Sequence, residues 1–147
     1  MSDNPPSTAQ IAGHPLHPML VGIPITCFVG ALLTDITYVK SLDMTWATFS
    51  AWLLAAGEAF GVLAAIPGII DFTNRRVRSQ RPAWPHAIGN VIALILGLFN
   101  NFVHSRDAYT SVMPTGLILS ILTVLVLAVT AWLGGSLTYK HRVGVRG

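Results

Sequence analysis

Long apolar segments separated by short polar connections dominate the pattern of this chain. They cover residues 19–39, 46–70, 87–103 and 113–133. A helix needs about 20 apolar residues to cross the hydrocarbon core of a bilayer, and each segment approaches or meets that length. The last segment includes Leu117-Ile-Leu-Ser-Ile-Leu-Thr-Val and is apolar on every side, so it offers no polar face to water. The pattern predicts an all-α bundle of four transmembrane helices.

Composition supports this membrane interpretation over a soluble helical bundle. Of the 147 residues, 52% are hydrophobic and only 10% are charged, whereas a soluble domain carries about 25% charged residues. The mean hydropathy is +0.61. The third segment is the shortest, and we expect it to be extended by His86 and His104, whose rings would reach toward water at its two ends. A polar N-terminal segment, residues 1–18, precedes the transmembrane domain, residues 19–147.

Positive charge is concentrated on one side of the predicted bundle. The connection after Asp71 and the tail after Gly134 carry seven cations: Arg75, Arg76, Arg78, Arg81, Lys140, Arg142 and Arg146. The other side carries Lys40 and Arg106. Because basic loops stay in the cytoplasm, both termini are predicted to be cytoplasmic. The pI of 9.5 reflects this asymmetry and does not indicate nucleic-acid binding. We expect the arginines to contact anionic lipid headgroups. Residues 1–13 contain no lysine or arginine, so we expect a permanent first helix rather than a signal peptide.

An internal repeat emerges when the sequence is shifted by 67 residues. The aligned pairs are Pro15 with Pro82, Pro18 with Pro85, Gly22 with Gly89, and Gly30 with Gly97. Each half then forms a similar helical hairpin, which predicts a parallel repeat about an axis along the membrane normal. Chance similarity between glycine-rich apolar helices is the alternative, since glycine and proline are frequent in such helices.

Polar residues recur on the third helix at steps of three or four. The stripe comprises His86, Asn90, Ala93, Gly97, Asn101 and His104. These positions share one helix face, and that face should contact the other helices because lipid offers no hydrogen bonds. Asparagines in such a stripe either bond neighbouring helices and fix the packing or line a polar path.

Glu58 lies near the middle of the second segment. A charge there costs at least about 2.5–3.5 kcal/mol on insertion scales, and no lysine or arginine lies at that depth. We therefore predict a protonated carboxyl, with Thr26, Cys27 and Thr123 as hydrogen-bonding neighbours at similar depth. A small transporter or channel subunit that uses Glu58 with Asn90 and Asn101 is one hypothesis, and it would require a dimer.

Histidines provide the strongest chemical signal. The motif His14-Pro-Leu-His17-Pro precedes the first helix, and a residue before proline is biased toward extended backbone. An even number of crossings places His14, His17, His86 and His141 on one membrane face with Asp71. Imidazole binds transition metals and haem iron, with Asp71 as a ligand or as an orienting carboxylate. Hydrogen bonding to water and headgroups is the alternative role.

The single cysteine, Cys27, excludes disulfides, thiolate clusters and covalent c-type haem. A non-covalent haem b or a transition metal is therefore the expected cofactor, if any. No serine–histidine–acid arrangement, phosphate loop or zinc-protease motif is present, and the sequence does not decide whether the protein is an enzyme.

Several of these motifs together resemble the bacterial membrane-protein family catalogued as domain of unknown function 2231. The resemblance rests on His14-Pro-Leu-His-Pro-Met-Leu-Val21, Gly68-Ile-Ile-Asp71, His86 with Asn90, and Trp132-Leu-Gly-Gly-Ser-Leu-Thr-Tyr-Lys-His141. It implies a four-helix protein of the bacterial inner membrane. In similar sequences glycine usually follows the last histidine, whereas Arg142 stands here.

Some similar sequences are joined to Rieske or cytochrome c domains, which implies membrane electron transfer. We therefore interpret the chain as a haem- or metal-binding electron-transfer component with a histidine cluster at the cytoplasmic face. Its electron partner would be a separate redox protein or a quinone. The transport hypothesis above, and a structural or assembly subunit of a membrane complex, are the alternatives.

Overall fold

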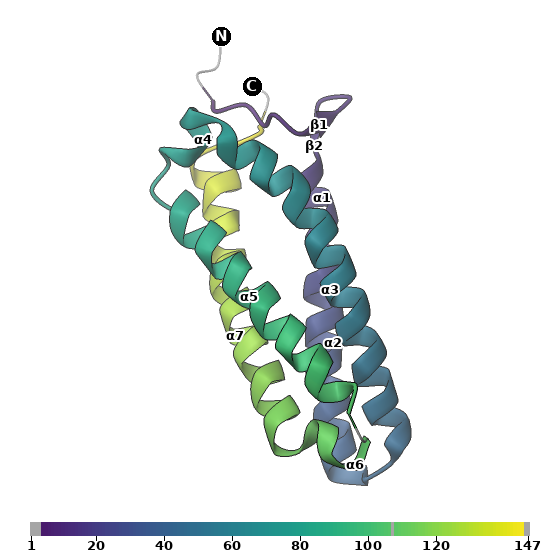
Figure 1. Cartoon of the computed structure of the whole chain (residues 1–147). Helices are drawn as coiled ribbons and strands as arrows, with labels where there is room; N and C mark the ends of the chain where they lie inside the picture. Colours follow the sequence, from purple (N-terminus) through teal and green to yellow (C-terminus); the bar gives the residue numbers. More distant parts are fainter. Residues whose placement is uncertain (1–3, 107, 146–147) are drawn as a thin grey trace.

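The computed structural model describes residues 4–106 and 108–145, which fold into an elongated helical bundle (Figure 1). Four helical stretches are long and apolar enough to cross a membrane: Leu16–Ser41, Met44–Thr73, Ala83–His104 and Val112–Lys140. Each extends past the limits expected from the apolar runs. The structure thus confirms the predicted all-α fold with four candidate spans.

The first span comprises α1 (Leu16–Leu20) and α2 (Gly22–Ser41), and the second is α3 (Met44–Thr73). The short helix α4 (Arg75–Arg78) connects α3 to α5 (Ala83–His104). After α6 (Ala108–Ser111), the chain kinks at Met113, whose backbone is extended, within Val112–Gly116. The last span continues as α7 (Leu117–Gly135) and ends in a wider, π-helical turn at Ser136–Lys140.

The four long helices form a ring. Helix α2 packs on α3 to make one hairpin, and α5 packs on α7 to make the other. The hairpins meet where α2 contacts α7 and where α3 contacts α5. Because successive helices run in opposite directions, the end that carries α4 lies opposite the end that carries α6 (Figure 1). We call these the α4 end and the α6 end.

The turn between α2 and α3 is short and well capped. Leu42 adopts a left-handed conformation with φ of 56° and ends α2. The Asp43 side chain accepts a hydrogen bond of 2.9 Å from the backbone N–H of Thr45, an arrangement that satisfies one free donor in the first turn of α3. This hydrogen bond holds the pKa of Asp43 below its ordinary value.

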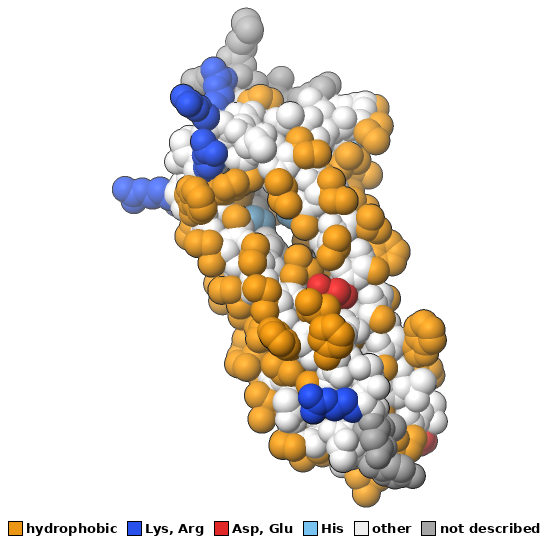
Figure 2. Space-filling view, in the orientation of Figure 1, with side chains coloured by type: hydrophobic (Ala, Val, Ile, Leu, Met, Phe, Trp, Pro, Cys, Tyr) orange, Lys and Arg blue, Asp and Glu red, His pale blue; other side chains and the backbone are white. Residues whose placement is uncertain are grey.

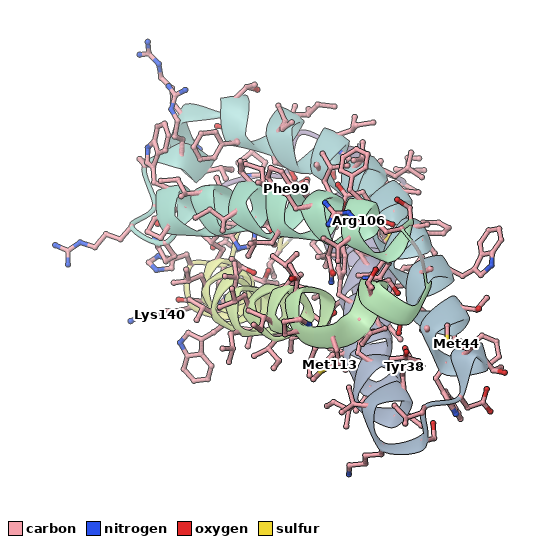
Figure 3. The ribbon with its side chains drawn as sticks, turned by 60° about the horizontal axis from the view of Figure 1, so that its bottom comes forward. Tyr38, Met44, Phe99, Arg106, Met113 and Lys140 are labelled. Atoms are coloured by element: carbon pink, nitrogen blue, oxygen red, sulfur yellow. The ribbon has the colours of Figure 1, made fainter. Side chains whose placement is uncertain are left out.

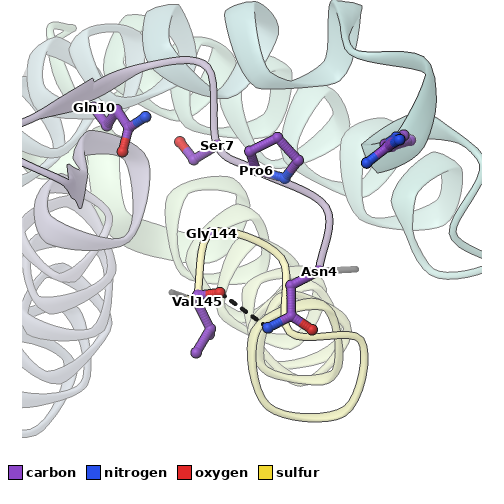
Figure 4. A pocket seen from close by; sticks show the side chains of 7 residues that line it. Asn4, Pro6, Ser7, Gln10, Gly144 and Val145 are labelled. Carbon is purple, nitrogen blue, oxygen red and sulfur yellow. Dashed lines mark hydrogen bonds between the residues drawn. The ribbon is translucent and has the colours of Figure 1, made fainter. Parts of the chain in front are cut away.

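The N-terminal segment, residues 4–15, folds back over the α4 end. Its strands β1 (Gln10–Ile11) and β2 (His14–Pro15) pair antiparallel. Asn4 Nδ2 donates to the Val145 carbonyl at 3.1 Å, so the two ends of the described chain lie side by side (Figure 4). A polar cleft of about 290 Å³ lies between this segment and the C-terminal tail.

The His-Pro-Leu-His-Pro motif is split between two conformations. His14 lies in extended β2, as the following proline favours, whereas His17 lies in the first turn of α1. Pro18 follows His17 within that turn. The N–H groups of a first turn have no acceptor within the helix, so proline, which lacks an N–H, costs no hydrogen bond there. His17 is thereby placed on the helix that leads into the bundle.

Apolar packing is strongest in the middle of the bundle and toward the α6 end. One buried cluster comprises Phe28, Ala31, Leu54, Ala93 and Leu127. A second comprises Tyr38, Ala47 and Val112, with Met44 packed against it at the α6 end (Figure 3). Large apolar side chains also cover the outer surface shown in Figure 2, which suits contact with lipid.

Candidate functional site

A largely apolar cavity of about 490 Å³ lies between the two hairpins in the half of the bundle nearer α4. Its wall includes Phe28, Gly61, Leu94 and Leu127, and its nitrogen-bearing side chains are His17, His86 and Asn90. Figure 2 shows a hollow in this face in which histidine atoms are visible. Ligand sites are commonly apolar cavities of about 300–1,000 Å³ with a few polar groups, so this is the first candidate site.

His17 enters the cavity from α1 and is fixed by α3. Its Nδ1 lies 2.8 Å from the Ala64 carbonyl oxygen. A carbonyl only accepts, so Nδ1 carries the proton and donates it. The ring lies over Gly68, one turn further along α3, where an added Cβ would lie 2.9 Å from Nδ1. Glycine is thus needed for this close approach.

His86 repeats the arrangement on the second hairpin. Its Nδ1 lies 2.9 Å from the Thr130 carbonyl oxygen, and its ring lies over Gly134, where an added Cβ would lie 2.9 Å from Cε1. In both hairpins the histidine therefore donates to a carbonyl of the partner helix and rests on the glycine four residues later. The parallel internal repeat as a whole stays a prediction.

The two imidazoles meet across the boundary between the hairpins. Their ring centroids are 5.9 Å apart and their planes are inclined by 84°. Asn90 Nδ2 donates to the His86 carbonyl at 2.9 Å and lies 3.1 Å from His86 Nε2. In the tautomer with the proton on Nδ1, each imidazole presents an Nε2 lone pair, and Asn90 Nδ2 donates to that of His86.

The expected cluster of four histidines is not observed. His14 is exposed on β2, and His141 follows the turn that ends the last span. Within residues 4–106 and 108–145, no group of three or more histidine, cysteine or acidic side chains is placed to hold a metal ion. Sharing a membrane face does not bring side chains into contact, because the end of a bundle is wider than one ligand sphere.

Asp71 contacts the N-terminal segment. Its carboxylate accepts from the Ser7 hydroxyl at 2.9 Å and from the backbone N–H groups of Thr8 and Ala9 at 2.6 and 2.9 Å. These bonds hold the segment over the α4 end of the cavity. Asp71 also lines the cavity. We expected it to orient an imidazole, but the contacts above are to the N-terminal segment and not to a histidine.

Glu58 and Asn101 lie where α3 crosses α5, below the cavity. Glu58 Oε2 is buried without a hydrogen-bond partner in the described residues. Asn101 Nδ2 donates to the carbonyls of Leu54 and Gly97 at 3.1 and 3.2 Å. The hydroxyls of Thr26 and Thr123, expected near Glu58, bond carbonyls of their own helices instead.

Sequence reasoning missed a buried polar network near the α6 end. The Asp35 carboxylate contacts His104 Nε2 at 3.0 Å and accepts a hydrogen bond from the Ser120 hydroxyl. Asn100 donates to Ser120 at 2.8 Å, and its side-chain oxygen lies 3.0 Å from His104 Nδ1. Asp35 is 0% exposed and His104 6%. His104 therefore points inward, and the expectation that it reaches water is wrong.

An acidic residue inside the first apolar run was the signal that could have found this network. Ionisable residues within membrane spans are rare and usually face a partner in the bundle. Asp35, together with Asn100 and His104 one turn apart, satisfies that description. We call these three residues and Ser120 the Asp35 network.

Four apolar spans, lipid-facing hydrophobic surfaces and a cavity between two hairpins define a multi-span integral membrane protein. The chain matches the family described as "Predicted membrane protein (DUF2231)" over residues 13–147 and belongs to it. The resemblance seen in the sequence is thereby confirmed. No curated protein and no solved structure matches the chain.

Proposed function

We propose that this protein is a membrane electron carrier that would bind haem b in the cavity, where His17 and His86 would hold the iron. The observation that carries the proposal is the pair of imidazoles, one from each hairpin, that meet in a T-shaped contact at the wall of the cavity. Each is oriented through Nδ1 by a backbone carbonyl. A hydrogen bond of this kind is the usual way to fix and strengthen a metal-ligating histidine.

The two imidazoles at the cavity wall offer lone pairs to a ligand. Both Nδ1–H groups are engaged by carbonyls, and the Asn90 amide donates to His86. In the tautomer with the proton on Nδ1, each ring still presents its Nε2 lone pair. A site with this chemistry suits a Lewis acid, and haem iron is one that carries an apolar body matching the apolar wall.

The number of ligands favours haem over a bare metal ion. A structural zinc site takes four protein ligands, and the described residues place only two imidazoles together. Haem iron already has four nitrogen ligands from its porphyrin, so His17 and His86 would suffice to hold it. For His86 to bind the iron, the contact between Asn90 Nδ2 and His86 Nε2 would have to break.

The site lies toward the α4 end, which carries most of the positive charge. The described cations there are Arg75, Arg76, Arg78, Arg81, Lys140 and Arg142. Positive-inside bias supports a cytoplasmic location for this end and for both termini, in a bacterial inner membrane. The electron partner would then be a separate redox protein or a quinone on that side. A homodimer is compatible with the apolar outer surfaces.

The test is the absorption spectrum of the detergent-purified protein, produced with haem available. We expect a Soret band that shifts on reduction with dithionite, and near-complete loss of bound haem in His17→Ala and His86→Ala. The matched controls are His14→Ala and His141→Ala, which should retain the band. A colourless, metal-free protein, or haem retained in both His17→Ala and His86→Ala, would contradict the proposal and favour a structural or assembly role.

A further inference from the structure

We propose that Glu58 is a proton-binding site in the interior of the membrane, which takes up and releases one proton independently of what occupies the cavity. Glu58 lies on α3, fourteen residues after Met44 and fifteen before Thr73, and so at the centre of the span. Neither the histidine pair nor the apolar core uses this carboxyl.

A glycine on the neighbouring helix makes room for the carboxyl group. A Cβ added at Gly97 of α5 would lie 2.7 Å from Glu58 Oε2 and 2.9 Å from the ring of Phe28. Oε2 therefore rests directly on the α5 backbone, beside an aromatic ring. It is buried there without a hydrogen-bond partner among the described residues.

No charge compensates a carboxylate at this level of the described bundle. From α2, the ring of Phe28 lies beside the same glycine, Gly97, as the Glu58 carboxyl, and the Cβ of Cys27 packs against Gly57, the residue before Glu58. From α5, Gly97 and the uncharged amide of Asn101 lie closest. At a rise of 1.5 Å per residue, His104 is about 10 Å and His86 about 16 Å along α5 from Gly97. An isolated carboxylate in this environment costs several kcal/mol, so the neutral acid is the stable form.

Glu58 Oε2 makes no hydrogen bond to the described residues that would hold the helices together, which favours a role for the carboxyl in binding a proton. The side chain is only half-buried, and Figure 2 shows acidic atoms among the hydrophobic side chains of the face between the hairpins. A leucine of similar size would pack there without the cost of burying a carboxyl. Gly61, about one turn further along α3, lines the cavity. The proton on Glu58 would therefore be held about one helical turn from a residue of the cavity wall.

The probe is N,N′-dicyclohexylcarbodiimide, an apolar reagent that reaches protonated carboxyls from the lipid. The carboxyl proton moves to one carbodiimide nitrogen while the carboxyl oxygen bonds to the central carbon, so the reaction requires the neutral acid. In proteoliposomes at neutral pH we expect one adduct, on the Glu58 peptide, by mass spectrometry. The adduct should be absent in Glu58→Gln, and its yield should fall at least several-fold as alkaline pH removes the proton.

Two glycine variants provide the matched comparison. Gly97→Ala should change the labelling rate several-fold, because its methyl group displaces Oε2 from its position on α5. Gly22→Ala should leave the rate unchanged, since nothing lies within 4 Å of an added Cβ there. Glu58→Leu should fold and unfold at an equal or higher temperature. Labelling confined to Asp43 and Asp71 would overturn the proposal, as would a yield of the Glu58 adduct that is the same at all pH values. A protein that binds no haem but is labelled at Glu58 would refute only the electron-carrier function.

Discussion

The α6 end and the α4 end of the bundle join the same two hairpins by different means. At the α6 end, Asp35 of the first hairpin is bonded to His104 and Ser120 of the second, and all three are buried. At the α4 end, His17 and His86 each bond within their own hairpin. They meet the other hairpin only at a ring contact beside a cavity of about 490 Å³.

This difference separates holding the bundle together from binding a ligand. A buried polar network in which every member has a partner fixes how the helices pack, because any shift leaves polar groups unpaired in a low-dielectric interior. The α4 end has no such network across the hairpins in the described residues, and its two imidazoles retain coordinating lone pairs. We infer that the α6 end provides stability and that the α4 end has been left open for a ligand.

The largest effect is expected from Asp35→Ala. Removing the carboxylate leaves His104 and Ser120 buried without their shared acceptor, and breaking such a buried pair costs about 3 kcal/mol or more. The matched variant at the other end, His17→Ala, removes a single hydrogen bond worth about 1 kcal/mol. Reversible unfolding by sodium dodecyl sulfate in mixed micelles would measure both. Equal destabilisation by the two variants would remove the distinction between the ends.

An identical change in the two regions should give different results. Ala31→Leu adds bulk at a position that is 0% exposed in the central core, and overpacking of this kind costs about 1–3 kcal/mol. Ala65→Leu adds the same bulk into the cavity wall, where space exists, and should change stability by less than about 1 kcal/mol. The same unfolding measurement applies. A large loss for Ala65→Leu would indicate that the cavity is already filled by protein.

Two glycines beneath the histidines should be sensitive to a single methyl group. Gly68→Ala and Gly134→Ala each place a carbon 2.9 Å from an imidazole, which forces the ring away from its carbonyl partner. We expect a loss of about 1 kcal/mol in each case and a loss of haem affinity. Gly22→Ala is the neutral control. Unchanged haem binding in both variants would mean that the position of the rings does not matter to the site.

The smallest effect is the pH response of the turn at Asp43. Its pKa is lowered in the folded protein, so its contribution to stability is present above the unfolded pKa, about 3.9, and is lost as pH falls through the lower, folded value. The protection factors of the amides at the start of α3, which correct for the intrinsic pH dependence of exchange, should therefore fall in acid. Asp43→Ser keeps a capping oxygen but does not titrate, and its exchange should lack this acid-dependent loss of protection.

Composition and apolar run length were sufficient to predict the four helices, because a span needs little information beyond about 20 apolar residues. The pairing of side chains was harder to predict. The stripe on α5 placed His86, Asn90 and His104 on one face, but periodicity does not say which residue of another helix meets that face. Asp35 and His104 are 69 positions apart, and only the rotation of α2 within the ring brings them together.

The candidate site was predicted in part. His17 and His86 were among the expected ligands, and the structure places them together. His14 and His141 were grouped with them through their shared membrane face, which fixes depth but not lateral position. Asp71 was expected beside the histidines, yet it bonds a segment that folds back over the bundle. Such a contact depends on loop closure, for which helical periodicity carries no signal.

The contrast between the two ends is tested most directly by distances between paired spin labels on α3 and α5. The labels would replace Ile70 and Ile88 near the α4 end, and Phe49 and Phe102 near the α6 end, all of them exposed. Pulsed electron–electron double resonance would be recorded in proteoliposomes before and after addition of haemin. We expect a narrow, unchanged distribution at the α6 end and a distribution at the α4 end that shifts or sharpens with haemin. Distance distributions that are the same at both ends and do not change with haemin would contradict the proposed contrast between the two ends.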